Sequence, residues 1–222
     1  MSTDVSTEWI ALTAADGHRF DAYRAAPRGT ARGALVVLPE IFGINPHIRR
    51  VCDGFAAAGY ATLAPALFDR TERKVELGYD DAGRTRGIGL MTSMDTEKTL
   101  LDVQAALAEL GDTAVVGYCW GGSLAWLAAA RLPVRAAVGY YGGQIGKTLD
   151  LVPKAPTLLH FGEKDQNIPL SVAEGVRQRH PAVIVHTYPA GHGFNCDERA
   201  SFDADSAALA LRRTLGLLDA AF

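Results

Sequence analysis

Cysteine is scarce in this sequence. The 222 residues include three, Cys52, Cys119 and Cys196, and no two of them have the CxxC spacing. An odd number without that spacing argues against a disulfide framework and against a zinc site. We therefore expect no metal and no cofactor, and the free thiols fit a reducing cytoplasm.

Long apolar runs are also missing. No window approaches the roughly 18 uninterrupted apolar residues of a membrane span. The first residues, MSTDVSTEWIALTAADGHRF, lack a basic segment followed by an apolar one, so the sequence predicts no secretory signal. These absences favour a cytoplasmic protein that does not act at a membrane.

Neither sign of charge is in large excess. The formal net charge is -3, and both signs are scattered along the chain. Nothing here predicts the positive field that nucleic acid or an anionic membrane requires. We expect a small neutral or mildly anionic ligand. The oligomeric state stays open, with a monomer favoured.

The remaining composition is that of a globular protein, with 48% hydrophobic and 21% charged residues, and it predicts a single α/β domain over residues 1–222. The segments TEWIALTA and RFDAYRAA flank Asp16-Gly17 and predict an antiparallel hairpin. Short apolar runs typical of buried strands follow: ALVVLPE, YATLAPAL, TAVVGYC, AAVGYYG, APTLLHFG and VIVHTYP. Helical spacing of apolar residues occupies residues 47–58, 95–110, 122–131, 170–180 and 203–219.

This alternation of strands and helices predicts a doubly wound, mostly parallel sheet with the hairpin at one edge. Active sites of such sheets lie at the carboxyl ends of the strands. Residues 68–94 have the weakest periodicity, and we interpret them as a long connection that partly covers the site.

Cys119 lies between a predicted strand and a predicted helix, within Gly117-Tyr118-Cys119-Trp120-Gly121. A sharp strand-to-helix turn needs small residues two before and two after a nucleophile, because its strained backbone leaves no room for side chains there. The motif therefore predicts a nucleophilic thiol. A buried structural cysteine is the alternative.

Such a nucleophile needs an acid and a histidine, in the chain order nucleophile, acid, histidine. Asp165 follows the strand in LLHFGEKD, and His192 follows the next strand in VIVHTYPAGHGF. Glu163 is a rival for the acid, and we prefer Asp165 because it comes deeper in the loop. His192 would take the thiol proton, and Asp165 would fix its tautomer.

The oxyanion of an acyl-transfer intermediate needs backbone donors, each worth on the order of 3 kcal/mol. One is expected to be the N–H of Trp120, directly after the nucleophile. The second normally comes from the loop after an early strand. That loop is LPEIFGIN, so the N–H of Ile41 is the candidate. Glu40, in the same loop, is expected near the cysteine, where its charge would disfavour a thiolate.

Taken together, PEIFGIN, VGYCWGG, VGYYGG, the turn from Gly162 to Asp165 and GHGF resemble the dienelactone hydrolase (carboxymethylenebutenolidase) family over nearly the whole chain. The resemblance implies an α/β hydrolase fold, a Cys119-Asp165-His192 triad and an activating role for Glu40. In that family the resting cysteine contacts the glutamate. Substrate binding releases an active thiolate, which opens a lactone through a thioester.

The resemblance also implies two arginines that hold a substrate carboxylate. Arg84 matches the first. The second position is Cys196, which cannot do this, and Arg199 is the candidate one turn further on. The family also has a pair of aromatic residues in this region, and this chain lacks them near Ile88 and Met91. An ester or lactone substrate is therefore expected, without a commitment to dienelactone itself.

Two other functions compete with a thiol hydrolase. A glutamine amidotransferase also uses a cysteine in GxCxG, but that class usually places a glutamate two residues after its histidine, where this chain has Phe194. The other alternative is a non-catalytic redox-sensing or ligand-binding protein with a reactive cysteine. In such a protein Cys119 would become oxidised stoichiometrically, without turnover of a substrate.

Overall fold

The computed structural model describes residues 5–222. They fall into two compact units, of which the first ends at Thr113 and the second runs from Ala114 to Phe222. None of the helices in residues 5–222 has the length and hydrophobicity of a transmembrane span.

The first unit contains the predicted hairpin. Strands β1 (Val5–Thr13) and β2 (Arg19–Pro27) pair antiparallel, with Val5 opposite Pro27 and Thr13 opposite Arg19. Strand β4 (Tyr60–Pro65) pairs antiparallel with β2 and parallel with β3 (Gly33–Leu38), which gives the order β1-β2-β4-β3.

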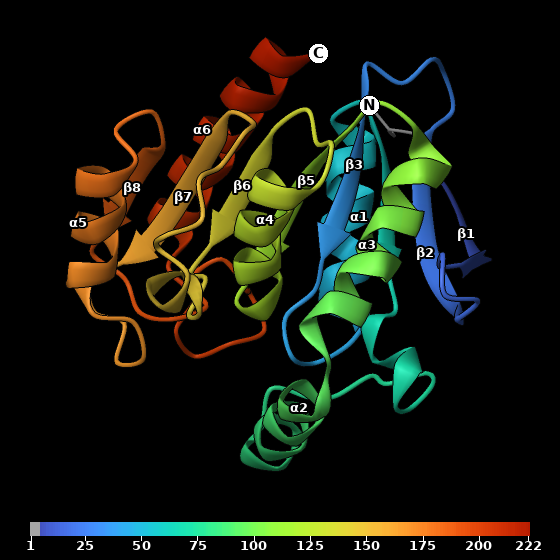
Figure 1. The fold of residues 1–222 in the computed structure, drawn as a ribbon, viewed down its shortest axis with the longest axis horizontal. Helices are drawn as coiled ribbons and strands as arrows, with labels where there is room; N and C mark the ends of the chain where they lie inside the picture. The colour runs from blue at the N-terminus through green and yellow to red at the C-terminus, as the bar shows by residue number, and fades with distance from the viewer. Residues whose placement is uncertain (1–4) are drawn as a thin grey trace. The chain divides into compact units, whose positions relative to one another are not determined.

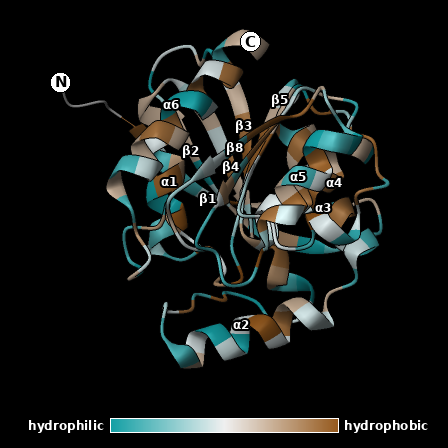
Figure 2. Cartoon of the chain, turned by 90° about the vertical axis from the view of Figure 1, so that its left-hand side faces the viewer, coloured by the Kyte–Doolittle hydropathy of each residue, from teal (hydrophilic) through white to brown (hydrophobic). Residues whose placement is uncertain are grey.

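The helices of the first unit are α1 (Pro46–Ala57), α2 (Asp81–Ser93) and α3 (Thr96–Leu110), with a short 3-10 helix, η1 (Leu67–Arg70). Helices α1 and α3 cover opposite faces of the strands (Figure 2). On α3 the spaced residues Leu100, Val103 and Leu107 are buried, as an amphipathic helix requires.

The second unit has four parallel strands in chain order: β5 (Thr113–Tyr118), β6 (Ala137–Tyr140), β7 (Thr157–Gly162) and β8 (Ile184–Tyr188). Its helices are α4 (Trp120–Arg131), α5 (Leu170–Arg179), α6 (Ala204–Ala221) and the short η2 (Ile145–Lys147). Helices α4 and α5 lie on one face of these strands and α6 on the other (Figure 1). The predicted fold class, a doubly wound and mostly parallel sheet with an N-terminal antiparallel hairpin, is confirmed.

Residues 68–94, which we interpreted as a long connection, contain a helix that the sequence pattern did not predict, α2 (Figure 1). The only buried residues of α2 are Gly83 and Gly87. A helix whose packed face consists of glycine has no apolar stripe, so its period is invisible to hydrophobic periodicity.

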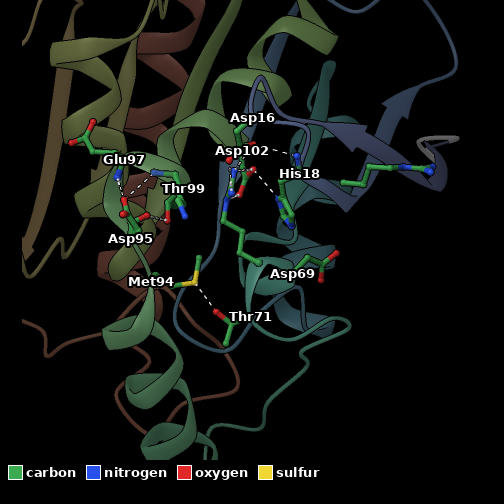
Figure 3. A network of polar contacts seen from close by, with 12 residues as sticks. Asp16, His18, Asp69, Thr71, Met94, Asp95, Glu97, Thr99 and Asp102 are labelled. Carbon is green, nitrogen blue, oxygen red and sulfur yellow. Dashed lines mark hydrogen bonds and ion pairs between the residues drawn. The ribbon is translucent and has the colours of Figure 1, made fainter.

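A charged network joins the hairpin turn, η1 and α3 (Figure 3). Asp102 on α3 is fully buried. Two guanidinium nitrogens of Arg70 donate to its two carboxylate oxygens at 2.7 Å each, and His18 Nδ1 lies 3.1 Å from Oδ1. Arg70 also pairs with Asp16 at 2.8 Å. The carboxylate thus ties together three segments that are distant in the sequence.

Replacing Asp102 by alanine is expected to lower the free energy of unfolding by up to about 3–5 kcal/mol, because the mostly buried Arg70 would lose its fully buried partner and keep only the partly exposed Asp16. Urea unfolding of the variant measures this. The control is Asp150→Ala, which removes an exposed ion pair to Arg179 and is expected to cost at most about 1 kcal/mol. Equal costs in the two variants would contradict the buried-pair explanation.

Candidate active site

Cys119 lies in the turn between β5 and α4, with a backbone φ of 54°. That left-handed conformation is strained for a residue with a side chain. The strain arises because strand and helix cross at very short range. A methyl group on Gly117 would overlap the backbone of Gly121, and one on Gly122 would overlap the carbonyl oxygen of Tyr140. The steric reason inferred for the small residues therefore has a direct structural counterpart.

The second unit brings Cys119, His192 and Asp165 into one hydrogen-bonded chain. His192 Nε2 lies 3.2 Å from Cys119 Sγ, and His192 Nδ1 lies 2.8 Å from Asp165 Oδ2. The other oxygen of Asp165 accepts from the backbone N–H groups of Asn167 and Ile168. Glu163, the rival acid, is exposed. The histidine thus lies between a thiol and a carboxylate whose orientation the backbone fixes.

Three effects act on the charge of His192. Burial lowers its pKa, but the hydrogen bonds to Asp165 and Cys119, together with the negative charge of those groups, outweigh burial and raise the pKa to about 10. A raised pKa favours the imidazolium at neutral pH. The geometry therefore suits a proton held on His192 beside the sulfur.

The loop that carries His192 has further supports, which the sequence did not reveal. The Tyr141 ring lies 5.1 Å from the His192 ring, and Tyr141 has a backbone φ of 39°. Ser201 donates from Oγ to the carbonyl of His192 at 2.6 Å. The tyrosine lies in the VGYYGG segment, but nothing in that pattern indicates which side chain its ring contacts.

Arg199 packs against this same loop. A methyl group on Gly193 would lie 2.5 Å from Nη1 of Arg199, so the guanidinium occupies the space that a side chain at Gly193 would need. Gly193 has a φ of 76°, which also favours glycine. The cation is therefore held one residue away from His192.

A buried histidine braces the strands that lead to Asp165 and His192. His160 on β7 has Nδ1 at 2.7 Å from the hydroxyl of Tyr188 on β8, and Nε2 at 3.1 Å from Thr214 on α6. Burial, followed by the charges of His186 and Arg213, holds the pKa of His160 well below its usual value. His160 is thus neutral, and it joins β7, β8 and α6 without adding a charge.

The two expected oxyanion donors lie in different units. Trp120 is the first residue of α4, and the dipole of a helix favours negative charge at its N-terminus. Ile41 is buried in the loop after β3 in the first unit.

Glu40 precedes Ile41 and is also buried. Its Oε2 accepts a hydrogen bond from the hydroxyl of Tyr79 at 2.8 Å. Tyr79 lies in the segment of weakest periodicity, where no sequence pattern indicates this contact. Arg84 is exposed on α2.

The family whose description is "dienelactone hydrolase family" matches residues 20–222 of this chain. The chain belongs to the dienelactone hydrolase family. Relatives within it include carboxymethylenebutenolidase 1 of Cupriavidus pinatubonensis, 32% identical, and the carboxymethylenebutenolidase of Pseudomonas putida, 34% identical. Each alignment covers 96% of this chain and 96% of the relative.

A solved structure leads to the same family. A candidate dienelactone hydrolase from Klebsiella pneumoniae subsp. pneumoniae has a TM-score of 0.80 and 31% sequence identity, over 96% of this chain and 98% of that one. This similarity confirms the α/β hydrolase fold, and with the family it supports a hydrolase of the dienelactone hydrolase type.

Cys119 is expected to be the one thiol that an alkylating agent modifies in the folded protein. Cys119 is partly exposed, whereas Cys52 and Cys196 are buried, and burial raises the pKa of the Cys52 thiol. Peptide mapping after treatment with iodoacetamide should find the label at Cys119 alone. All three cysteines should be labelled in denaturant, which serves as the control. Prior labelling of Cys52 or Cys196 would contradict the burial.

Proposed function

We propose that this protein hydrolyses a carboxylic ester or lactone through a thioester on Cys119, with His192 and Asp165 completing a triad. The observation that carries the proposal is the hydrogen-bonded chain from Asp165 through His192 to the sulfur, at 2.8 and 3.2 Å. The family relationship supports the substrate class, because the relatives are carboxymethylenebutenolidases. Since the family match extends over both units, we propose one hydrolase domain.

The first half of the reaction forms the thioester. The Cys119 thiolate attacks the carbonyl carbon, and the carbonyl electron pair moves onto oxygen. The N–H groups of Trp120 and Ile41 are proposed to donate to that oxyanion. When the intermediate collapses, the C–O bond to the leaving alcohol breaks and the imidazolium of His192 gives that oxygen its proton. A lactone would open at this step and keep its alcohol on the acyl group.

The second half releases the acid. His192, now neutral, takes a proton from water as the oxygen attacks the thioester carbonyl. Collapse of the second oxyanion expels the Cys119 thiolate and leaves the imidazolium beside it. Asp165 keeps the ring in the tautomer that both halves need.

The position of Arg199 is an argument for a substrate that carries a carboxylate. Its guanidinium packs against Gly193, next to the proposed base, and arginine binds carboxylates with two parallel hydrogen bonds. We propose Arg199 for this role in place of the family arginine whose position is Cys196. Arg84 is proposed as the second cation, on the resemblance alone. Three free thiols favour a reducing compartment.

The test is steady-state hydrolysis of aryl esters and lactones, each with and without a free carboxylate. Wild type is expected to turn over, with the carboxylated member of each pair faster, and Cys119→Ala is expected to lose at least about 10³-fold in kcat because no thioester can form. The matched control is Cys52→Ala, which removes a buried thiol outside the proposed triad and should retain turnover.

Equal rates for wild type and Cys119→Ala would refute the proposed function. Stoichiometric oxidation of Cys119 in a wild type that does not turn over any of these substrates would instead favour a redox-sensing protein.

We propose that Glu40 disfavours ionisation of the Cys119 thiol in the absence of substrate, as the family resemblance implies, because a carboxylate disfavours a nearby thiolate. Removing the charge by Glu40→Gln should raise the rate of Cys119 alkylation in the absence of substrate, even if turnover falls. Glu163→Gln is the matched control, since it removes the same charge from an exposed position and should leave the rate within about twofold. An unchanged or lower rate in Glu40→Gln would count against this restraint.

A further inference from the structure

The loop that carries Ile41, the proposed second oxyanion donor, is held by residues 75–79 and by helix α2. Both lie in the stretch whose structure was not predicted from the sequence. This loop, residues 40–45, lies along residues 75–79 within the first unit. Leu77 N–H donates to the carbonyl of Phe42 at 2.9 Å, and Gly43 forms an antiparallel bridge with Glu76. The Phe42 and Tyr79 rings lie 4.5 Å apart. One side of the loop is therefore fixed by hydrogen bonds and ring contact.

Helix α2 closes on the loop through a glycine. A methyl group on Gly87 would overlap the carbonyl oxygen of Ile41 and would lie 3.2 Å from its Cβ. The helix backbone thus rests directly on the residue whose N–H is the proposed donor. Gly83, one turn earlier, packs in the same way against the carbonyl of Gly78. Gly89, two residues further on, has no neighbour within 4 Å of such a methyl group.

The chemistry gives this contact a consequence. An oxyanion donor must lie within a few tenths of an ångström of its productive position, because the hydrogen bond weakens quickly with distance and angle. The Ile41 side chain is buried, and its carbonyl is confined by the Gly87 backbone. A methyl group at position 87 would press on both the Ile41 carbonyl and its Cβ, so we expect it to shift the Ile41 Cα and, with it, the peptide group that carries the Ile41 N–H.

We propose that Gly87 is a positioning residue, whose missing side chain lets α2 seat against Ile41 and so sets the direction of the Ile41 N–H. This inference rests on the proposed function, because it assigns Gly87 a role only through the oxyanion donor. It also explains why α2 packs with glycine on its inner face. A helix interior otherwise disfavours this residue, which has a lower propensity than alanine.

The test compares Gly87→Ala with Gly89→Ala, the same change in the same helix where space is open. The kcat for an aryl ester should fall at least about tenfold in Gly87→Ala relative to Gly89→Ala, short of the 10²- to 10³-fold effect of deleting a donor. The KM should change by less than about threefold, because ground-state binding does not use the donor. Alkylation of Cys119 by iodoacetamide should agree within about twofold, since that displacement forms no oxyanion.

A general loss of structure is separated by Gly83→Ala, in which the methyl meets Gly78 instead of Ile41. Its kcat should stay near that of wild type even where its melting temperature falls. If Gly87→Ala folds poorly, the comparison is made between Gly87→Ala/Gly89→Ala and Gly89→Ala, because alanine at position 89 supports the helix. Loss of folding in both backgrounds would overturn the proposal, since a local rotation of Ile41 does not require unfolding.

The positioning role is also overturned if kcat is equal in Gly87→Ala and Gly89→Ala, if Gly83→Ala loses as much kcat as Gly87→Ala, or if alkylation falls in parallel with kcat. These outcomes differ from failure of the proposed function, in which Cys119→Ala would turn over as fast as wild type.

Discussion

Where β5 passes into α4, two stretches of backbone come so close that no side chain fits between Gly117 and Gly121. This crossing places Cys119 in a left-handed conformation, and the packing of α4 against the strands maintains it. Eleven of the twelve residues of α4 are buried. The sulfur is therefore presented to His192 by the most deeply packed helix of the unit, and the strain in the turn is offset by burial around it.

The strand-to-helix turn at Cys119 and the closeness of His192 and Asp165 to it could be predicted because their signals are local. The glycines at 117 and 121 follow from sterics at two residues' distance, and Asp165 and His192 follow from chain order at successive strand ends. The buried strands could be predicted from their short apolar runs. In contrast, the contacts of Tyr141 and Ser201 with His192 depend on how a loop folds back, and a side chain in a loop has no periodicity that could indicate its partner.

Helix α2 shows a different limit of sequence reasoning. Periodicity finds a helix by the apolar side chains it buries, and α2 buries glycine instead. Glycine on the inner face leaves the helix without an apolar pattern, and at Gly87 it also allows the helix backbone to contact the backbone of Ile41. Likewise, the hydrogen bond from Tyr79 to Glu40 joins two irregular segments. The prediction of Glu40 and Ile41 came from their place after a strand, and their supports became visible only in three dimensions.

Helix α2 packs through its glycine backbone, so the side chains on its outer face do not contribute to the hydrophobic core. The exposed positions of α2, among them Arg84, Thr85 and Ile88, support no core, so their side chains can vary in size, charge and polarity at little cost to folding. At Gly83 and Gly87, in contrast, any side chain would press on a backbone carbonyl. Diversity in this region should therefore be confined to one side of the helix, and a library built there would alter the protein's surface chemistry while the hydrophobic core stays untouched.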